Sequence, residues 1–250
     1  MAGSEAALLV VAGFAAGLAG SIAGLASLIS YPALLAAGLP PLTANVTNTA
    51  ALIFSSVGSV AGSRVELVGQ GRRMRRLGAL GVIGGMAGSA LLLATPAGAF
   101  ELVVPWLVGL ASVGILIQRS PERLARRHHG GDGRALPVAT LAIGVYGGYF
   151  GAGAGVFLLA VLLLETSETF ARSNAAKNVV LGAANAVAAI GFAFFGPVRW
   201  AAAIPLAIGF LVGGRLGPPL VRRAPSGPLR VLIAAAGIGL AVHLGLDAYG

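Results

Sequence analysis

Long apolar stretches separated by short polar segments run along the whole chain. Each stretch is close to, or longer than, the roughly 20 residues with which a helix crosses a bilayer core. The pattern therefore predicts an all-α fold, a polytopic transmembrane helical bundle without a separate soluble domain. The stretches, about eight in number, lie near residues 7–38, 44–63, 77–94, 99–118, 136–164, 173–196, 199–221 and 228–246.

Two of the stretches are too long for a single membrane helix. Residues 7–38 would form a helix of about 48 Å and residues 136–164 one of about 44 Å, whereas the hydrocarbon core is about 30 Å thick. Both stretches are rich in glycine, which weakens a helix and permits sharp bends. We expect each to break, as a kinked helix or as a re-entrant hairpin, at the helix-break glycines Gly20, Gly24, Gly151 and Gly155.

The glycine spacing also predicts an internal duplication. Four glycines between residues 13 and 24 recur at an offset of 131 residues, and a later set of landmarks recurs at an offset of 129. A shared order of landmarks with one small gap indicates two homologous halves. We expect a first transmembrane repeat at 1–118, a basic cytoplasmic loop at 119–135 and a second transmembrane repeat at 136–250. The pairs include Gly13 with Gly144, Gly17 with Gly148, Gly20 with Gly151, Gly24 with Gly155, Asn45 with Asn174 and Gly84 with Gly213.

Loop charges indicate how the two halves are oriented. The loop at 64–76 carries five arginines, whereas its counterpart at 196–200 has only Arg199. The loop at 95–100 has no basic residue, whereas its counterpart at 222–230 has three. Because basic loops stay in the cytoplasm, this exchange favours an inverted repeat over a parallel repeat of four plain spans. We expect 64–76, 119–135 and 222–230 to share the cytoplasmic side.

The composition is that of an integral membrane protein. Of the 250 residues, 57% are hydrophobic and 10% charged, and the mean hydropathy is +0.89, which excludes a water-soluble enzyme. The net charge of +9 comes largely from the loops, since ten of the 17 basic residues lie in 64–76 and 119–134. We therefore expect the lipid bilayer of the cell membrane, and no nucleic acid, as partner. With no cysteine, three histidines and eight carboxylates, we expect no metal and no cofactor, and a homodimer is left open.

Polar residues open one apolar segment in each half. Thr43–Thr49 open the second segment, and Asn174, Lys177 and Asn178 lie at i, i+3 and i+4, on one helical face of the matching segment. A lysine inside a membrane helix costs about 2.5–3.5 kcal/mol on insertion scales, so it should face an aqueous cavity or a partner. Helix starts at the glycine breaks would add unpaired N–H groups, which favour an anion.

The candidate substrate-binding residues carry amide, hydroxyl or cationic groups in apolar segments. For Lys177 and Arg215 the alternative is snorkelling to the interface. For the asparagines it is hydrogen bonding between helices. The candidates are Asn45, Asn48, Thr49, Asn174, Lys177, Asn178 and Arg215.

Two glycine-rich segments and the polar segments after them resemble one known family. The residues concerned are GFAAGLAGSIAGLASLISYPALLAAGLP at 13–40 with TANVTNT at 43–49, and GVYGGYFGAGAG at 144–155 with ARSNAAKNVVLGAANAVAA at 171–189. They resemble the sulfite exporter TauE/SafE family of membrane transporters, and the likeness covers nearly the whole chain outside 119–135. It implies export of small oxyanions or organosulfonates, such as sulfite or sulfoacetate, driven by an ion gradient.

Two functions remain open from the sequence. The first is a secondary transporter that exports a small sulfur-containing oxyanion. The alternative is a passive anion channel or a transporter of another small anion, which would need the same cationic lining. An inverted repeat favours the transporter. An intramembrane enzyme is not expected, because no acid or histidine lies in an apolar segment in the pairings that such chemistry needs.

Overall fold

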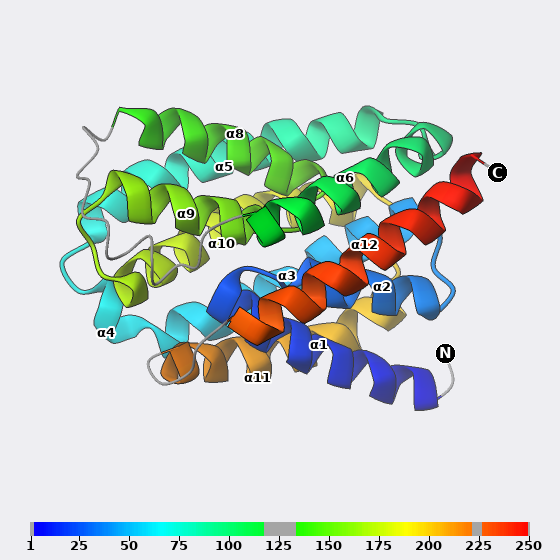
Figure 1. Ribbon diagram of the computed structural model, residues 1–250, viewed down its shortest axis with the longest axis horizontal. Helices are drawn as coiled ribbons and strands as arrows, with labels where there is room; N and C mark the ends of the chain where they lie inside the picture. Colours follow the sequence, from blue (N-terminus) through cyan, green and yellow to red (C-terminus); the bar gives the residue numbers. More distant parts are fainter. Residues whose placement is uncertain (1–2, 118–133, 222–226, 250) are drawn as a thin grey trace.

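The computed structural model describes residues 3–117, 134–221 and 227–249, and this part of the chain folds into helices without strands. The helices are α1 (Gly3–Ala23), α2 (Ser27–Ala36), α3 (Pro41–Gly62), α4 (Arg64–Leu67), α5 (Gly71–Ala94), α6 (Ala97–Ile117), α8 (Ala135–Tyr149), α9 (Ala154–Glu165), α10 (Phe170–Phe195), α11 (Trp200–Val221) and α12 (Gly227–Tyr249) (Figure 1). Helix α3 is as long as the other long helices, but its first turns contain the polar residues of 43–49.

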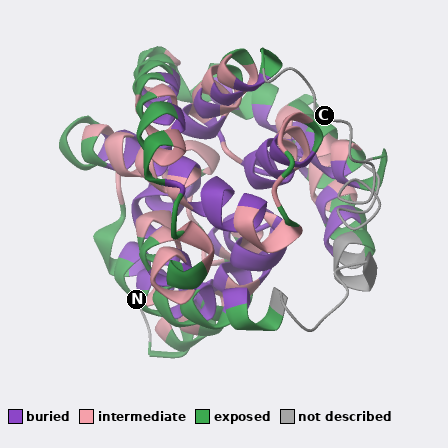
Figure 2. Cartoon of the chain, turned by 90° about the vertical axis from the view of Figure 1, so that its left-hand side faces the viewer, coloured by how far each residue is buried: buried purple, intermediate pink, exposed green. Residues whose placement is uncertain are grey.

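The predicted membrane bundle is confirmed by the helices and by the surface. Among the described residues, five helices are long and apolar enough to cross a membrane, namely α1, α5, α6, α10 and α11. Large apolar side chains lie on the outside, such as Phe194 (78% exposed), Phe195 (80%) and Leu110 (68%). Figure 2 shows buried residues toward the inside of the bundle and exposed ones around its outside. An apolar exterior of this kind suits contact with lipid.

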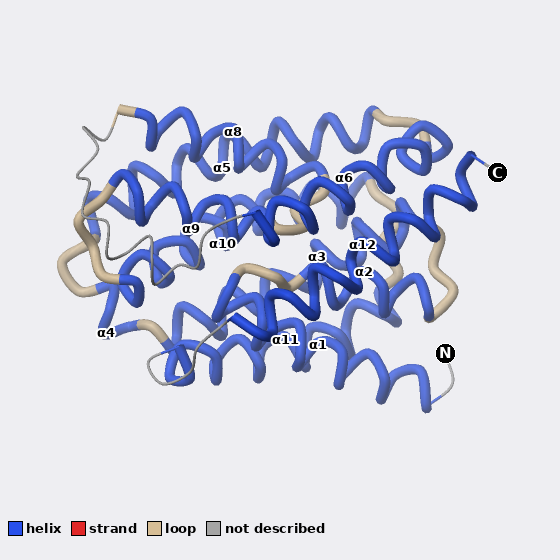
Figure 3. Tube along the Cα trace, viewed as in Figure 1, coloured by secondary structure: helices blue, strands red, loops and turns tan. Residues whose placement is uncertain are grey.

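Both overlong segments break at glycines, as predicted. Helix α1 ends at Ala23 and is followed by Gly24, whose φ is +77°, and α8 ends at Tyr149, before Gly151 (φ +78°) and Gly153 (φ +76°). Glycine adopts these left-handed conformations without the steric cost of a Cβ. The chain then turns back, so that α2 returns toward the end where α1 begins, and α9 toward the end where α8 begins (Figure 3). The two segments are therefore helical hairpins rather than kinked spans.

The two hairpins enter the bundle from opposite ends. In Figure 1, α1 starts at the right and α8 at the left. The later helices alternate accordingly, so that α3 runs opposite to α10, α5 opposite to α11 and α6 opposite to α12. Apart from the short α4, each described helix after the first hairpin is thus matched in chain order by a helix of opposite direction after the second hairpin.

Helices from the two parts of the chain interleave. Helix α11 packs against α1 and α3, whereas α5 packs against α8 and α10, and α6 pairs with α12. Glycines allow the closest of these contacts. A Cβ on Gly84 of α5 would lie 2.6 Å from the carbonyl oxygen of Leu141 in α8, and a Cβ on Gly17 of α1 would lie 2.7 Å from that of Phe210 in α11. Small residues of this kind let membrane helices approach backbone to backbone.

One end of the bundle, which we call the basic end, carries five arginines between residues 64 and 76. The α9–α10 connection lies there too, because Arg73 pairs with Glu168 at 3.0 Å and Glu168 also pairs with Arg172. Helix α11 finishes and α8 starts at this end, whereas α6 runs toward it and α12 runs away from it (Figure 1). Most of the predicted cytoplasmic loops at 119–135 and 222–230 lies outside the described residues. We call the other end, where α1 begins, the opposite end.

Candidate functional site

A polar cavity lies where the two hairpin tips meet the middle of α3 and α10. Its volume is about 50 Å³. One water needs about 10–15 Å³, so the cavity holds a few waters or one small molecule. Its lining comprises Gly20, Gly24, Ala26, Ser27, Leu52, Ser55, Ser56, Ser59, Gly147, Gly151, Ala154, Gly155, Lys177, Asn178, Leu181 and Asn185.

Two helices begin at this cavity. Ser27 opens α2 and Ala154 opens α9, and both residues belong to the lining. Neither helix has a side-chain cap at its N-terminus. The first N–H groups of a helix have no partner within the helix, and the helix dipole makes this end positive. The cavity therefore receives two positive helix ends, which attract an anion.

The carbonyl ends of α1 and α8, by contrast, receive donors from the other half of the chain. Lys177 Nζ donates to the carbonyl oxygen of Gly20 at 2.9 Å, and Asn174 Nδ2 donates to that of Ser21 at 2.7 Å. Asn45 Nδ2 donates to the carbonyl oxygen of Tyr149 at 2.9 Å. The bonds to Ser21 and Tyr149 pair carbonyls in the last turns of α1 and α8. Lys177 adds a second donor to Gly20, which also accepts from the N–H of Gly24 at 2.8 Å. The C-terminal ends of α1 and α8 thus receive side-chain donors, whereas the N-termini of α2 and α9 have no side-chain cap.

Lys177 supplies the charge of the cavity. Its side chain is buried, with 1% exposed, and therefore does not snorkel to the surface. The ammonium can donate three hydrogen bonds, and one of them goes to Gly20. No carboxylate occurs among the residues of the lining that the structure describes. A buried ammonium without a counter-ion favours an anionic occupant.

Asn178 adds an amide donor beside Lys177 in the same lining. Its side chain is 6% exposed, and its Nδ2 has no hydrogen-bond partner. A buried donor without an acceptor costs about 1–3 kcal/mol, which an occupant with an acceptor oxygen would offset. Ammonium, amide and two helix N-termini together form a set of donors that suits an oxyanion.

The predicted site residues divide into those that line the cavity and those that surround it. Lys177, Asn178 and the four helix-break glycines Gly20, Gly24, Gly151 and Gly155 line it. Asn45 and Asn174 lie outside the lining and cap helix ends. They make the hydrogen bonds between helices that the sequence left open as an alternative role for the asparagines.

Three further candidates lie away from the lining. Asn48 accepts a hydrogen bond from the Ser30 hydroxyl at 2.6 Å and donates to Ser27 Oγ at 3.1 Å, so it holds a lining residue in place. The Thr49 hydroxyl donates to the carbonyl oxygen of Asn45 within α3. Arg215 is exposed on α11 and does not reach the cavity.

Sequence reasoning missed the hydroxyls of the cavity. Ser55 and Ser59 lie one turn apart on α3 and are buried, with Ser56 beside them and Ser27 at the start of α2. Their i, i+4 spacing within an apolar segment is the signal that could have marked them. Asn185, two turns beyond Asn178 on α10, completes the polar lining.

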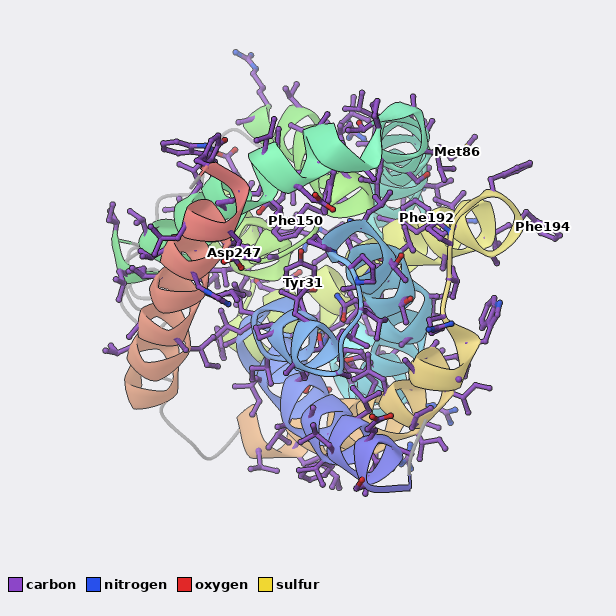
Figure 4. All side chains as sticks on the ribbon, turned by 90° about the vertical axis from the view of Figure 1, so that its right-hand side faces the viewer. Tyr31, Met86, Phe150, Phe192, Phe194 and Asp247 are labelled. Carbon is purple, nitrogen blue, oxygen red and sulfur yellow. The ribbon has the colours of Figure 1, made fainter. Side chains whose placement is uncertain are left out.

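An aromatic cluster lies on the side of the helix breaks toward the opposite end, since α2 runs from Ser27 in that direction. The rings of Tyr31 and Phe150 meet edge to face with centroids 5.5 Å apart, and Phe100 lies 6.2 Å from Phe150. All three side chains are buried. Figure 4, viewed from the opposite end, shows Tyr31 and Phe150 near the middle of the bundle. Ser59, in contrast, lies one turn before the end of α3 at the basic end.

Oppositely directed broken helices around a buried polar cavity define a helical membrane transporter. The chain belongs to the Sulfite exporter TauE/SafE family, whose model matches residues 9–244. It is 28% identical to the probable membrane transporter protein YfcA of Escherichia coli (strain K12), over 97% of this chain and 91% of that protein. It is also 28% identical to the probable membrane transporter protein ORF9 of Sinorhizobium sp., over 96% of this chain and 92% of that protein. No solved structure matches the chain.

Proposed function

We propose that the protein is a secondary transporter that exports small sulfur-containing oxyanions, such as sulfite or organosulfonates, across the cell membrane. The anion binds in the cavity at the helix breaks. Lys177 supplies the opposite charge, Asn178 donates a hydrogen bond, and the N-termini of α2 and α9 add the positive ends of two helix dipoles. The family description names sulfite as the exported compound, which supports this class of substrate.

The observation that carries the proposal is a surplus of donors in a buried cavity. The Lys177 ammonium and the unpartnered Asn178 amide lie in a lining that has no carboxylate among its described residues. A cation would meet repulsion there, and an apolar solute would leave the amide unpaired. An oxyanion offers both a negative charge and several acceptor oxygens.

The packing around the cavity favours a transporter over a passive channel. The buried rings of Tyr31, Phe150 and Phe100 lie on the side of the helix breaks toward the opposite end, whereas the serines of α3 extend the polar lining toward the basic end. A channel needs a continuous polar path, and a transporter opens to one side at a time. This arrangement supports a conformation in which the site is open toward the basic end, which would be the cytoplasmic end under the positive-inside rule.

Alternating access follows from an inverted repeat of 1–118 and 136–250, which we propose as the organisation of the chain. The matching helices run in opposite directions (Figure 1). The asparagines paired by the predicted duplication, Asn45 and Asn174, each cap a broken helix of the other half. Rocking of one half against the other around the shared cavity would expose the site to each side in turn.

The test is a counterflow assay with purified protein in proteoliposomes. Vesicles are loaded in turn with sulfite, sulfate, sulfoacetate, thiosulfate or acetate, and uptake of labelled sulfite is measured. We expect saturable uptake that sulfite or sulfoacetate inside accelerates and that acetate does not. Flux proportional to concentration without acceleration would instead identify a channel. Acceleration by acetate alone would mean that the substrate belongs to another class of anion.

A further inference from the structure

A second cavity, separate from the one at the helix breaks, lies at the basic end. It has a volume of about 410 Å³ and lies between the start of α5, the start of α8 and the α9–α10 connection. It shares no lining residue with the central cavity. Its lining comprises Gly69, Gln70, Arg72, Arg73, Arg76, Leu77, Leu136, Pro137 and Glu168.

This second cavity has more positive than negative charge. Arg73 pairs with Glu168 at 3.0 Å, and the same carboxylate also accepts from Arg172, so Glu168 is already shared between two guanidinium groups. Arg72 and Arg76 are exposed and have no ion-pair partner within the described residues. They lie one turn apart on α5 and both line the cavity. Two guanidinium groups at this spacing can bind one phosphate group by paired hydrogen bonds.

Part of the wall, formed by Leu77, Leu136 and Pro137, is apolar and lies at the membrane boundary. Leu77, with 2% exposed, directly follows Arg76 and begins the apolar part of α5. Leu136 and Pro137 face the cavity from the start of α8. The charged part of the cavity therefore lies where the membrane spans end, which is the depth of lipid headgroups, and its apolar part continues toward the acyl chains.

We propose that this cavity binds the phosphate group of an anionic phospholipid, with Arg72 and Arg76 as its ligands and an acyl chain along Pro137 at the start of α8. Arg73, held by Glu168, forms the back of the site. The lipid touches α5 of the first half and α8 of the second half, so it links the two halves at the basic end. A free phosphate ion could pair with the same arginines, but it has no acyl chain to contact the apolar part of the wall.

The site is tested by lipid binding to the purified protein in a neutral detergent, without any transport measurement. Phosphatidylglycerol, phosphatidylcholine and inorganic phosphate are added separately, and bound lipid is counted by native mass spectrometry beside the midpoint of thermal unfolding. We expect phosphatidylglycerol to bind and to raise the midpoint, since a ligand of the folded state stabilises it. We expect a much smaller effect from the other two.

Variants locate the binding. In Arg72→Gln/Arg76→Gln the apparent affinity for phosphatidylglycerol should fall at least tenfold. The matched control is Arg64→Gln/Arg75→Gln, which removes two exposed charges of the same end outside the cavity and should bind as the wild type does. The single variant Arg76→Gln gives an intermediate affinity. Equal loss in both double variants would mean unspecific attraction and overturn the site. A full effect of phosphatidylcholine or of inorganic phosphate would overturn the assignment to an anionic lipid.

Discussion

Gly24 and Gly155 lie against each other at the tips of the two hairpins. A Cβ placed on Gly24 would lie 2.6 Å from the Cα of Gly155, and one placed on Gly155 would lie 2.5 Å from the Cα of Gly24. Carbon atoms in contact are normally about 3.5–4.0 Å apart, so only glycine fits at either position. The two residues are also partners in the predicted duplication. Contact between equivalent residues is what a two-fold axis through the cavity requires.

Alanine should destabilise the protein at both positions, but by different amounts. Gly155→Ala places a methyl group against backbone, and overpacking of this kind costs about 1–3 kcal/mol. Gly24→Ala adds the cost of a left-handed residue at φ +77°, about 1–2 kcal/mol more. We expect the midpoint of thermal unfolding in detergent to fall in the order wild type, Gly155→Ala, Gly24→Ala.

Two control variants separate strain from contact. Gly38 has φ +81° and nothing within 4 Å of its Cβ position, so Gly38→Ala reports backbone strain alone. Gly78, inside α5, also has open space and no positive φ, and Gly78→Ala should be neutral or slightly stabilising. If Gly24→Ala lost no more stability than Gly38→Ala, the hairpin tips would not be packed as described here.

The sequence predicted the helix breaks, because length and glycine spacing are local properties, but it left open whether each segment is kinked or folds back as a hairpin. It could not place the members of one helix face relative to the cavity. Asn174, Lys177 and Asn178 share a face of α10, but Asn174 lies one turn earlier and reaches Ser21 at the end of α1, whereas Lys177 and Asn178 reach the cavity. Periodicity gives the face of a helix, but the depth at which another element crosses it depends on tertiary packing.

Arg215 illustrates a second limit of the sequence pattern. Its neighbours Gly213 and Gly214 face α1 and α3, since their Cβ positions would meet Phe14 and Ser55. Successive residues of a helix point about 100° apart, so Arg215 is turned to the outside although its segment is apolar. The cavity serines were missed for the converse reason. Serine hydroxyls among alanine and valine residues can be recognised as part of a site only when the helix that faces them is known.

Asn178→Leu should weaken anion binding without loss of stability. The amide Nδ2 has no partner in the protein, so its removal breaks no internal hydrogen bond. A hydrogen bond to a charged ligand contributes about 1.5–3 kcal/mol, and we therefore expect the KM for the transported anion to rise roughly 10- to 100-fold. Initial rates in proteoliposomes and the thermal midpoint measure the two effects. Asn178→Asp, which adds a negative charge, should abolish transport, and a wild-type KM in Asn178→Leu would remove the amide from the site.

The inverted repeat predicts the sidedness of four exposed positions. Single cysteines can be introduced at will, because the chain has none. We expect cysteines at Val65 and Ala135 to react with an impermeant maleimide only after the cells are opened, since both lie at the basic end. Cysteines at Ser4 and Gly98 should react in intact cells. Ser4 and Ala135 begin the two hairpins, so labelling of both from the same side would mean a parallel repeat.

Lys177 has two roles in the structure that substitution can separate. It lines the cavity, and it caps α1 through Gly20. Lys177→Met keeps an unbranched side chain with good helix propensity and removes both the charge and the cap. Asn45→Leu is the matched control, because Asn45 caps α8 through Tyr149 from outside the cavity. Each variant loses one hydrogen bond to a helix end, so we expect comparable decreases in the thermal midpoint.

Transport should distinguish the two variants. Asn45→Leu should retain saturable uptake per folded molecule, whereas Lys177→Met should lose most of it, because the anion then enters a buried cavity without a counter-charge. Lys177→Arg should keep part of the activity, since the charge survives in a larger, planar group. The measurement is initial counterflow normalised to the amount of monodisperse protein. If Lys177→Met and Asn45→Leu transported equally well, the lysine would act as a helix cap only, and the N-termini of α2 and α9 with Asn178 would have to bind the anion without it.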